Sequence, residues 1–269
     1  MNHAAGPYLN LNWHWIWLIA AAFLGGTLNA VAGGGSLLLF PAMLGMGIPP
    51  IQANATNTVA LWPGQLTSAA AYRSDVQRHW RLAILLGFAG LVGGTAGATL
   101  LLHTPQRMFL HLVPWLLFTA SSIFAISGPV SRWLVRRKEE RSVHGEPHGF
   151  GRISALVLSV TAVCFYIGYF GAGAGFVLMT VLVLFGFEDL HEVNALKVVS
   201  TLMANGMAFV MFVLNGQVEW HYCLLAMVVC GIGGYTSARL ARKIPQPILR
   251  AAVVLFGFSM SAFFFWKVG

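Results

Sequence analysis

The chain has very few charged side chains. Of its 269 residues, only 9% are Asp, Glu, Lys or Arg, whereas a soluble domain usually has about 25%. So little charge cannot cover a water-facing surface. The hydrophobic content of 57% and the mean hydropathy of +0.72 fit a chain whose surface largely faces lipid. The composition therefore excludes an ordinary soluble domain and predicts a polytopic membrane protein.

Acidic residues are the scarcer charged type, with 8 Asp plus Glu against 16 Lys plus Arg. A basic excess is also typical of nucleic-acid-binding proteins. Here, however, most basic residues gather in three short stretches between apolar segments, at 73–81, 132–141 and 239–250. Basic loops between apolar spans follow the positive-inside rule of membrane proteins. No nucleic-acid partner is therefore expected.

Motifs for catalysis and metal binding are also lacking. The three cysteines, Cys164, Cys223 and Cys230, lie in apolar segments and form no CxxC pair, so neither zinc nor disulfides are indicated. His191-Glu192 does not extend to HExxH, because residue 195 is Ala. There is no GxSxG or Walker motif. We therefore expect no metal, no cofactor and no enzymatic activity, and a membrane-embedded enzyme stays as the least favoured alternative.

An internal repeat relates the two halves of the chain at an offset of 140 residues, without gaps. An internal repeat of this size is typical of secondary transporters. The offset predicts a first transmembrane repeat at 1–127, a linker at 128–151 and a second transmembrane repeat at 152–269. The clearest matches align Ala32, Gly33 and Gly35 with Ala172, Gly173 and Gly175, Asn54-Ala55 with Asn194-Ala195, Gly93-Gly94 with Gly233-Gly234, and Pro105-Gln106 with Pro245-Gln246.

Each half contains five apolar segments, which predicts an all-α protein of 8–10 helices. A full crossing needs about 20 residues, so the short second segment of each half is either a short crossing or one arm of a re-entrant hairpin. The first twelve residues hold no Lys or Arg, so we expect the N-terminal segment to be retained rather than cleaved. The segments are 13–31, 35–47, 54–72, 81–102 and 107–127, then 152–171, 174–187, 194–214, 221–241 and 247–266.

The charges of the loops predict that the two halves are inserted upside down to each other. The basic loop at 73–81 should be cytoplasmic, whereas its counterpart at 215–221 has Glu219 and no Lys or Arg. The linker, rich in Gly, Pro and His after its basic core, is then a mobile cytoplasmic connection. Both termini lie outside. These expectations describe a multi-pass protein of a bacterial inner membrane, built from two inverted repeats.

The first candidate site is the glycine break that follows the first segment of each half. The breaks free backbone N–H groups at the start of the next helix, and these groups favour an anion. In secondary transporters, interrupted helices in corresponding positions of two halves mark the substrate site. The alternative is that the glycines only let helices pack closely. The candidate residues are Gly33, Gly34, Gly35 and Ser36, with Gly173, Ala174 and Gly175.

The second candidate lies on the third segment of each half. Asn54, Thr56 and Asn57 correspond there to Asn194, Leu196 and Lys197. Helix capping is the alternative for Asn54 and Asn194, but it does not account for Asn57 or for a lysine at its counterpart.

Lys197 is the most informative single residue, because an ionisable group within an apolar span marks a functional site by default. It can attract an anion, or its ammonium can extend to a nearby interface. Ser200 and Thr201 lie on adjoining surfaces of the same segment. Asn205, its counterpart Gln65, and Asn29 are lesser candidates.

These motifs resemble those of the sulfite exporter TauE/SafE family of membrane permeases. The resemblance is carried by AGGGSLLLFPAMLGMGIPP, ATN and YR in the first half, and by GAGAGF, NALKVVS and GQVEW in the second. It implies the transport of sulfur-containing anions such as sulfite, thiosulfate or organosulfonates, usually as export. Asn54 departs from the pattern, since many members have Gly or a small residue there, so the substrate preference can differ.

We therefore hypothesise a secondary carrier that works by alternating access, with its site near the midplane between the two halves. A passive anion channel is the alternative. The expected partners are a small anion and the lipid bilayer, with protons as a candidate coupling ion and a homodimer as a candidate assembly.

Overall fold

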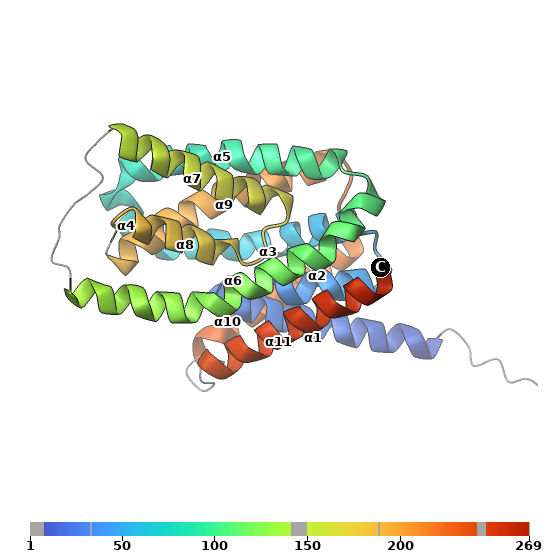
Figure 1. Cartoon of the computed structure of the whole chain (residues 1–269). Coiled ribbons are helices and arrows are strands. Elements are labelled where there is room, and N and C mark those ends of the chain that lie inside the picture. The colour runs from blue at the N-terminus through green and yellow to red at the C-terminus, as the bar shows by residue number, and fades with distance from the viewer. Residues whose placement is uncertain (1–7, 33, 141–149, 188, 241–245, 269) are drawn as a thin grey trace, which may run out of the picture.

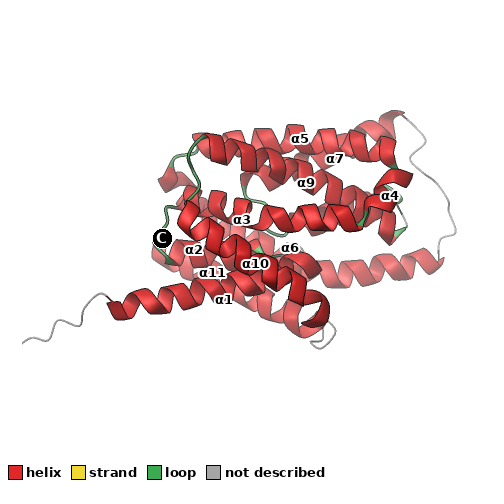
Figure 2. Cartoon of the chain, turned by 180° about the vertical axis from the view of Figure 1, so that it is seen from behind, coloured by secondary structure: helices red, strands yellow, loops and turns green. Residues whose placement is uncertain are grey.

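The structure is a computed structural model that describes residues 8–32, 34–140, 150–187, 189–240 and 246–268. Within these ranges the chain forms eleven helices and no strand (Figures 1 and 2). The helices are α1 (Tyr8–Ala32), α2 (Ser36–Gly45), α3 (Pro50–Ala71), α4 (Arg73–Arg78), α5 (Trp80–His103), α6 (Gln106–Glu140), α7 (Phe150–Tyr169), α8 (Ala174–Leu184), α9 (Leu190–Leu214), α10 (Trp220–Leu240) and α11 (Gln246–Val268).

All ten predicted apolar segments are helices, which confirms the all-α architecture. Two of them begin four residues before the predicted boundary, for local reasons. α3 begins at Pro50, whose fixed φ suits the first helical turn. α9 begins after Asp189, whose side chain accepts a hydrogen bond from the backbone N–H of His191 at 2.9 Å. The eleventh helix, α4, lies in the basic loop and was not predicted.

The predicted linker is partly helical, because α6 continues to Glu140. The sequence analysis placed the end of the first repeat at residue 127 and a mobile connection after it. Residues 141–149 lie outside the described residues. The division into two repeats and a linker stays a prediction.

Helix length distinguishes two kinds of segment. In the described part of the chain, four helices are long and apolar enough to cross a membrane: Trp80–His103, Gln106–Ile126, Gly151–Tyr169 and His191–Leu214. By contrast, α2 and α8 have 10 and 11 residues, about 15–17 Å at 1.5 Å per residue. This is about half of the roughly 30 Å hydrocarbon core. The length favours the re-entrant arm over the short crossing for both helices.

The packing of the helices repeats between the halves. α5 packs along α7 and α9, and its counterpart α10 packs along α1 and α3. α2 contacts α1, α3 and α11, just as α8 contacts α7, α9 and α6. Figure 1 shows α5, α7 and α9 on one side of the bundle, α1, α10 and α11 on the other, and α3 between them. Helices at the same position in the two halves thus have equivalent neighbours.

The corresponding helices α5 and α10 run in opposite directions. The start of α3 lies beside the end of α5, because the N–H of Ile51 donates to Oε1 of Gln106 at 3.0 Å. It also lies beside the start of α10, because the N–H of Glu219 donates to Oγ1 of Thr56 at 3.0 Å. The end of α5 and the start of α10 therefore share one end of the bundle. These directions support the inverted insertion of the two halves, which stays a prediction.

Helices α3 and α9 cross at the centre of the bundle, where residues meet their own counterparts. Nε1 of Trp62 donates to the carbonyl of Leu202, and Nδ2 of Asn205 donates to Oε1 of Gln65, each at 3.3 Å. Both pairs are 140 residues apart in sequence, which is the offset of the repeat. The crossing of α3 and α9 therefore brings positions 140 residues apart into contact at two successive turns.

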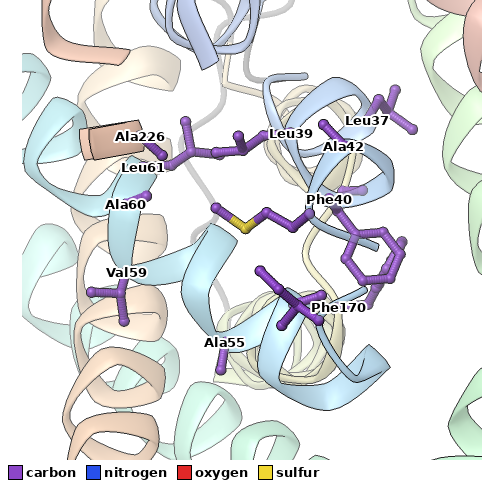
Figure 3. Packing of buried hydrophobic residues seen from close by; sticks show 14 of the residues in the cluster. Leu37, Leu39, Phe40, Ala42, Ala55, Val59, Ala60, Leu61, Phe170 and Ala226 are labelled. Atoms are coloured by element: carbon purple, nitrogen blue, oxygen red, sulfur yellow. The ribbon is translucent and has the colours of Figure 1, made fainter. Parts of the chain in front are cut away.

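The short helix α2 is enclosed by protein. Figure 3 shows Leu39 of α2 directed towards Leu61 of α3, and Phe40 of α2 beside Phe170, which follows α7. The rings of Phe40 and Phe170 meet edge to face with their centroids 5.2 Å apart. A helix whose ends lie at membrane depth is tolerated when protein rather than lipid surrounds it.

Glycines let the helix backbones approach closely across the halves. A Cβ added at Gly26 would lie 2.1 Å from the carbonyl oxygen of Cys230, and one added at Gly94 would lie 2.4 Å from that of Ala204. Small residues at such crossings are typical of helix packing in membranes.

Candidate substrate-binding site

A polar cavity of about 360 Å³ lies between the two halves, bounded mainly by α3, α8 and α9. Both halves contribute to it. The lining residues are Asn29, Ser36, Thr58, Leu61, Gln65, Ser68 and Tyr72 from the first half, with Ile167, Phe170, Gly171, Ala174, Gly175, Phe176, Met179, Asn194, Lys197, Val198, Thr201 and Asn205 from the second.

Lys197 is the only charged side chain among the described residues that line this cavity. Its Nζ donates to Oδ1 of Asn194, one turn earlier on α9, at 2.8 Å. The ammonium therefore faces polar groups inside the protein rather than the bilayer, contrary to the alternative of a side chain that extends to the interface. With no carboxylate among the described lining residues, the cavity carries a positive charge that suits an anion.

The glycine break of the second half forms one wall of the cavity. Gly171 and Gly173 have φ values of 78° and 75°, in the left-handed region that glycine adopts most readily. This turn allows α8 to begin at Ala174, and both Ala174 and Gly175 line the cavity. At this start the N–H groups of Ala174 and Phe176 donate to the carbonyls of Gly171 and Gly173, and the helix start carries a partial positive charge. It therefore adds to the attraction of an anion.

The glycine break of the first half is tightly packed. A Cβ added at Gly34 would lie 2.7 Å from the ring of Phe124, and one added at Gly35 would lie 2.4 Å from the carbonyl oxygen of Gly25. Neither glycine lines the cavity, and their part in substrate binding stays a prediction. Ser36, the first residue of α2, lines the cavity. Gly33 lies outside the described residues.

Asn54 and Asn57 lie behind the cavity wall, with relative exposures of 1% and 0%. Nδ2 of Asn54 donates to the carbonyl of Tyr169, and Nδ2 of Asn57 donates to Oγ of Ser36, each at 3.1 Å. Neither Asn54 nor Asn194 caps a helix, because the caps are Pro49 and Asp189. The capping alternative is therefore wrong for both residues.

The remaining predicted residues divide between the cavity and the protein interior. Thr201 lines the cavity. Thr56 and Ser200 are fully buried away from it: the hydroxyl of Thr56 accepts from the N–H of Glu219, and that of Ser200 donates to the carbonyl of Leu196.

Thr58, Ser68 and Tyr72 also line the cavity along α3, although they are not among the predicted site residues. A signal was present, because Thr58 lies seven residues before Gln65, and Ser68 and Tyr72 lie three and seven residues after it, which are helical spacings. Gln65 was noticed only as the counterpart of Asn205. The polar residues on the same face of α3 as Gln65 include the other three.

Comparison with known proteins gives the family. The model of the family "Sulfite exporter TauE/SafE" matches residues 18–264. Of the curated relatives, a "Probable membrane transporter protein" of Haemophilus influenzae is 25% identical over 250 residues, covering 91% of this chain and 92% of that protein. The "Probable membrane transporter protein ORF9" of Sinorhizobium sp is 28% identical over 250 residues, covering 91% and 89%.

A third relative, "Probable membrane transporter protein YfcA" of Escherichia coli K12, is 26% identical over 249 residues, covering 91% and 87%. No solved structure matches the chain. The family match spans nearly all of the helical bundle, and the relatives are matched almost from end to end. The protein therefore belongs to the sulfite exporter TauE/SafE family and is a multi-pass membrane transporter.

Proposed function

We propose that this protein is a secondary transporter that exports small sulfur-containing anions, such as sulfite, thiosulfate or organosulfonates, through the cavity between its halves. The observation that carries the proposal is the Lys197 ammonium, held by Asn194 in a polar cavity whose described lining has no carboxylate. The family supports sulfur-containing anions as the substrate class.

Several neutral donors surround the ammonium. The hydroxyls of Ser36 and Thr201 and the start of α8 at Gly175 line the same space. Hydroxyl and backbone N–H groups bind the oxygens of an anion, and their charge-assisted hydrogen bonds are about twice as strong as neutral ones. A cavity of about 360 Å³ is at the small end of ligand pockets. It therefore suits a small anion with some retained water.

The cavity extends towards one end of the bundle. Its lining includes Tyr72, just after the end of α3, and Asn194, near the start of α9. The basic loop at 73–81 lies at this end, where Nδ1 of His79 and Oε1 of Glu192 are 2.9 Å apart. By the positive-inside rule, this end faces the cytoplasm.

At the opposite end, the hydrogen bonds of Ile51 and Thr56 tie α3 to the neighbouring loops. We infer an inward-facing state, which tilting of α3 against α9 at their crossing would convert to an outward-facing one. In this orientation the protein lies in a bacterial inner membrane with the linker in the cytoplasm and both termini outside. A gradient of substrate or of an ion drives the transport.

Uptake of radiolabelled sulfite into proteoliposomes tests the proposal. We expect saturable uptake that thiosulfate or a sulfonate competes for, and that an imposed gradient accelerates. Ohmic single-channel currents would favour a channel instead. No uptake of any sulfur-containing anion by folded protein would refute the substrate assignment.

A further inference from the structure

Two buried amide oxygens on α3 have no hydrogen-bond partner among the described residues. Asn54 and Asn57 are three residues apart, so their side chains share one face of the helix on successive turns. Both side chains are almost completely buried, and Oδ1 of each accepts no hydrogen bond from the described residues. Buried acceptors are rarely left unpaired in proteins, and an exception requires a physical explanation such as a bound water or ion.

The orientation of the Asn54 amide follows from its neighbour. Its Nδ2 lies 3.1 Å from the backbone carbonyl oxygen of Tyr169, which can only accept a hydrogen bond. The amide cannot be turned over without placing two acceptors against each other. Nδ2 of Asn57 donates to Oγ of Ser36; a hydroxyl can donate as well as accept, so only the orientation of Asn54 is fixed by its partner. In the arrangement of the structure both side chains offer an acceptor oxygen, which repels an anion and attracts a cation.

The second half of the protein shows what such an oxygen binds. At the offset of 140 residues, Asn54 corresponds to Asn194 and Asn57 corresponds to Lys197. There Oδ1 of Asn194 accepts from the ammonium of Lys197 at 2.8 Å. The first half also has the amide acceptor, Asn54, but it has Asn57 at the position of Lys197.

A helix end adds to this preference at Asn54. α7 ends at Tyr169, whose carbonyl is the partner of Asn54. The end of a helix carries a partial negative charge. In transporters with broken helices, free carbonyls and helix ends of this kind coordinate monovalent cations. The side-chain groups identified here are neutral, which suits a monovalent cation better than a divalent one.

We propose that the amide oxygens of Asn54 and Asn57 bind an alkali-metal cation, at the place in the first half that corresponds to the Lys197 ammonium in the second. The cation would lie behind Ser36, next to the anion site. Its place next to an anion site rests on the proposed transport function, whereas the binding of the cation does not.

Thermal unfolding of the purified protein in detergent tests the binding without any transport assay. The protein is melted in NaCl, KCl and choline chloride at equal concentration, so that the anion and ionic strength are constant. A cation that binds only the folded protein raises the melting temperature, and we expect a shift on the order of 5 °C in NaCl or KCl relative to choline chloride. Equal melting temperatures in the three salts would overturn the proposal.

An Asn57→Lys variant provides the sharpest second test, because it gives the first half the same pair as Asn194 and Lys197. Its ammonium should replace the bound cation. We expect the melting temperature of the variant in choline chloride to equal that of the wild type in NaCl. The melting temperature of the variant should no longer respond to Na⁺ or K⁺. A folded variant that keeps the full response would contradict the site.

Milder variants keep the test valid if a lysine is not tolerated there. Asn57→Ser shortens the side chain and should raise the concentration of Na⁺ needed for half of the shift by at least about 10-fold, since it removes one ligand. The matched control is Asn215→Ala, an exposed asparagine just after α9, which should leave the response unchanged. A loss of the response in both variants would point to a general effect on folding and would overturn the assignment.

The two proposals can fail independently. A cation-dependent melting temperature without uptake of sulfur-containing anions would retain the cation site and refute the substrate. Uptake that is identical in NaCl, KCl and choline chloride, with no thermal shift, would retain the transporter and refute the cation site.

Discussion

Nδ2 of Asn205 donates to Oε1 of Gln65 at 3.3 Å, and these residues occupy the same position in the two halves of the chain. The contact joins α3 to α9 inside the polar cavity. One turn earlier, Nε1 of Trp62 donates to the backbone carbonyl of its counterpart Leu202. Any movement that exchanges the conformations of the two halves must pivot near these pairs.

A cross-link between positions 65 and 205 should therefore be tolerated. Cysteines introduced as Gln65→Cys and Asn205→Cys can be joined by a short bifunctional thiol reagent, since the native side chains are in contact. We expect the cross-linked protein to keep most of the uptake of the untreated double variant, because at a pivot α3 and α9 change their relative tilt while the distance between these two positions stays the same. The native cysteines are buried. The untreated double variant and each single variant treated with the reagent serve as controls, and loss of uptake after complete cross-linking would exclude a pivot here.

Replacing Lys197 should weaken transport without unfolding the protein. A hydrogen bond to a charged group contributes about 1.5–3 kcal/mol, so Lys197→Ala should lower the apparent affinity for the anion roughly 10- to 100-fold. Uptake as a function of substrate concentration measures this. Lys267→Ala, at the exposed end of α11, is the matched control and should transport like wild type. Equal kinetics for the two variants would remove Lys197 from the site.

Two glycines of the second break should respond differently to alanine. Gly173 has a left-handed φ of 75°, and an added Cβ would lie 3.3 Å from the carbonyl oxygen of Ala120. Gly175 has an ordinary helical conformation and open space around it. We expect Gly173→Ala to lower the free energy of unfolding by about 1–2 kcal/mol, and Gly175→Ala to change it little. Denaturant titration compares them, and an equal loss in both would show that the strain at Gly173 is not the cause.

Thiol labelling from each side of the membrane tests the orientation. Ser68→Cys lines the cavity near the end of α3, and Asn215→Cys is exposed at the opposite end of the bundle. A membrane-impermeant maleimide should label position 68 in inside-out vesicles and position 215 in right-side-out vesicles. The reverse pattern would invert the topology. Labelling of position 68 from both sides would favour a continuous pore.

Much of the fold could be predicted because its helices are long apolar runs separated by glycine, proline and charge. The polar helix α4 and the extension of α6 are not apolar runs, so they were not predicted. Both are built from polar residues whose helix propensity is a weak signal without apolar periodicity.

The site could be predicted only in part. Lys197 is conspicuous because an isolated charge in an apolar segment is costly. The sequence does not distinguish Thr58, which faces the cavity, from Asn57, which faces Ser36, because α3 is enclosed on several sides and has no single apolar face. Which polar residue faces which neighbour depends on the crossing of α3 and α9. That crossing is set by tertiary packing.

The length of α6 has a consequence for how the protein is made. Its 35 residues extend about 52 Å, of which the membrane-crossing part, Gln106–Ile126, takes only about 32 Å. The remaining helix contains the densest basic run of the chain, Arg136-Arg137-Lys138. In the orientation proposed above, this run would anchor the growing chain at the cytoplasmic face as the ribosome completes α6. The direction in which α7 enters the bilayer would thus be decided before α7 has been synthesised.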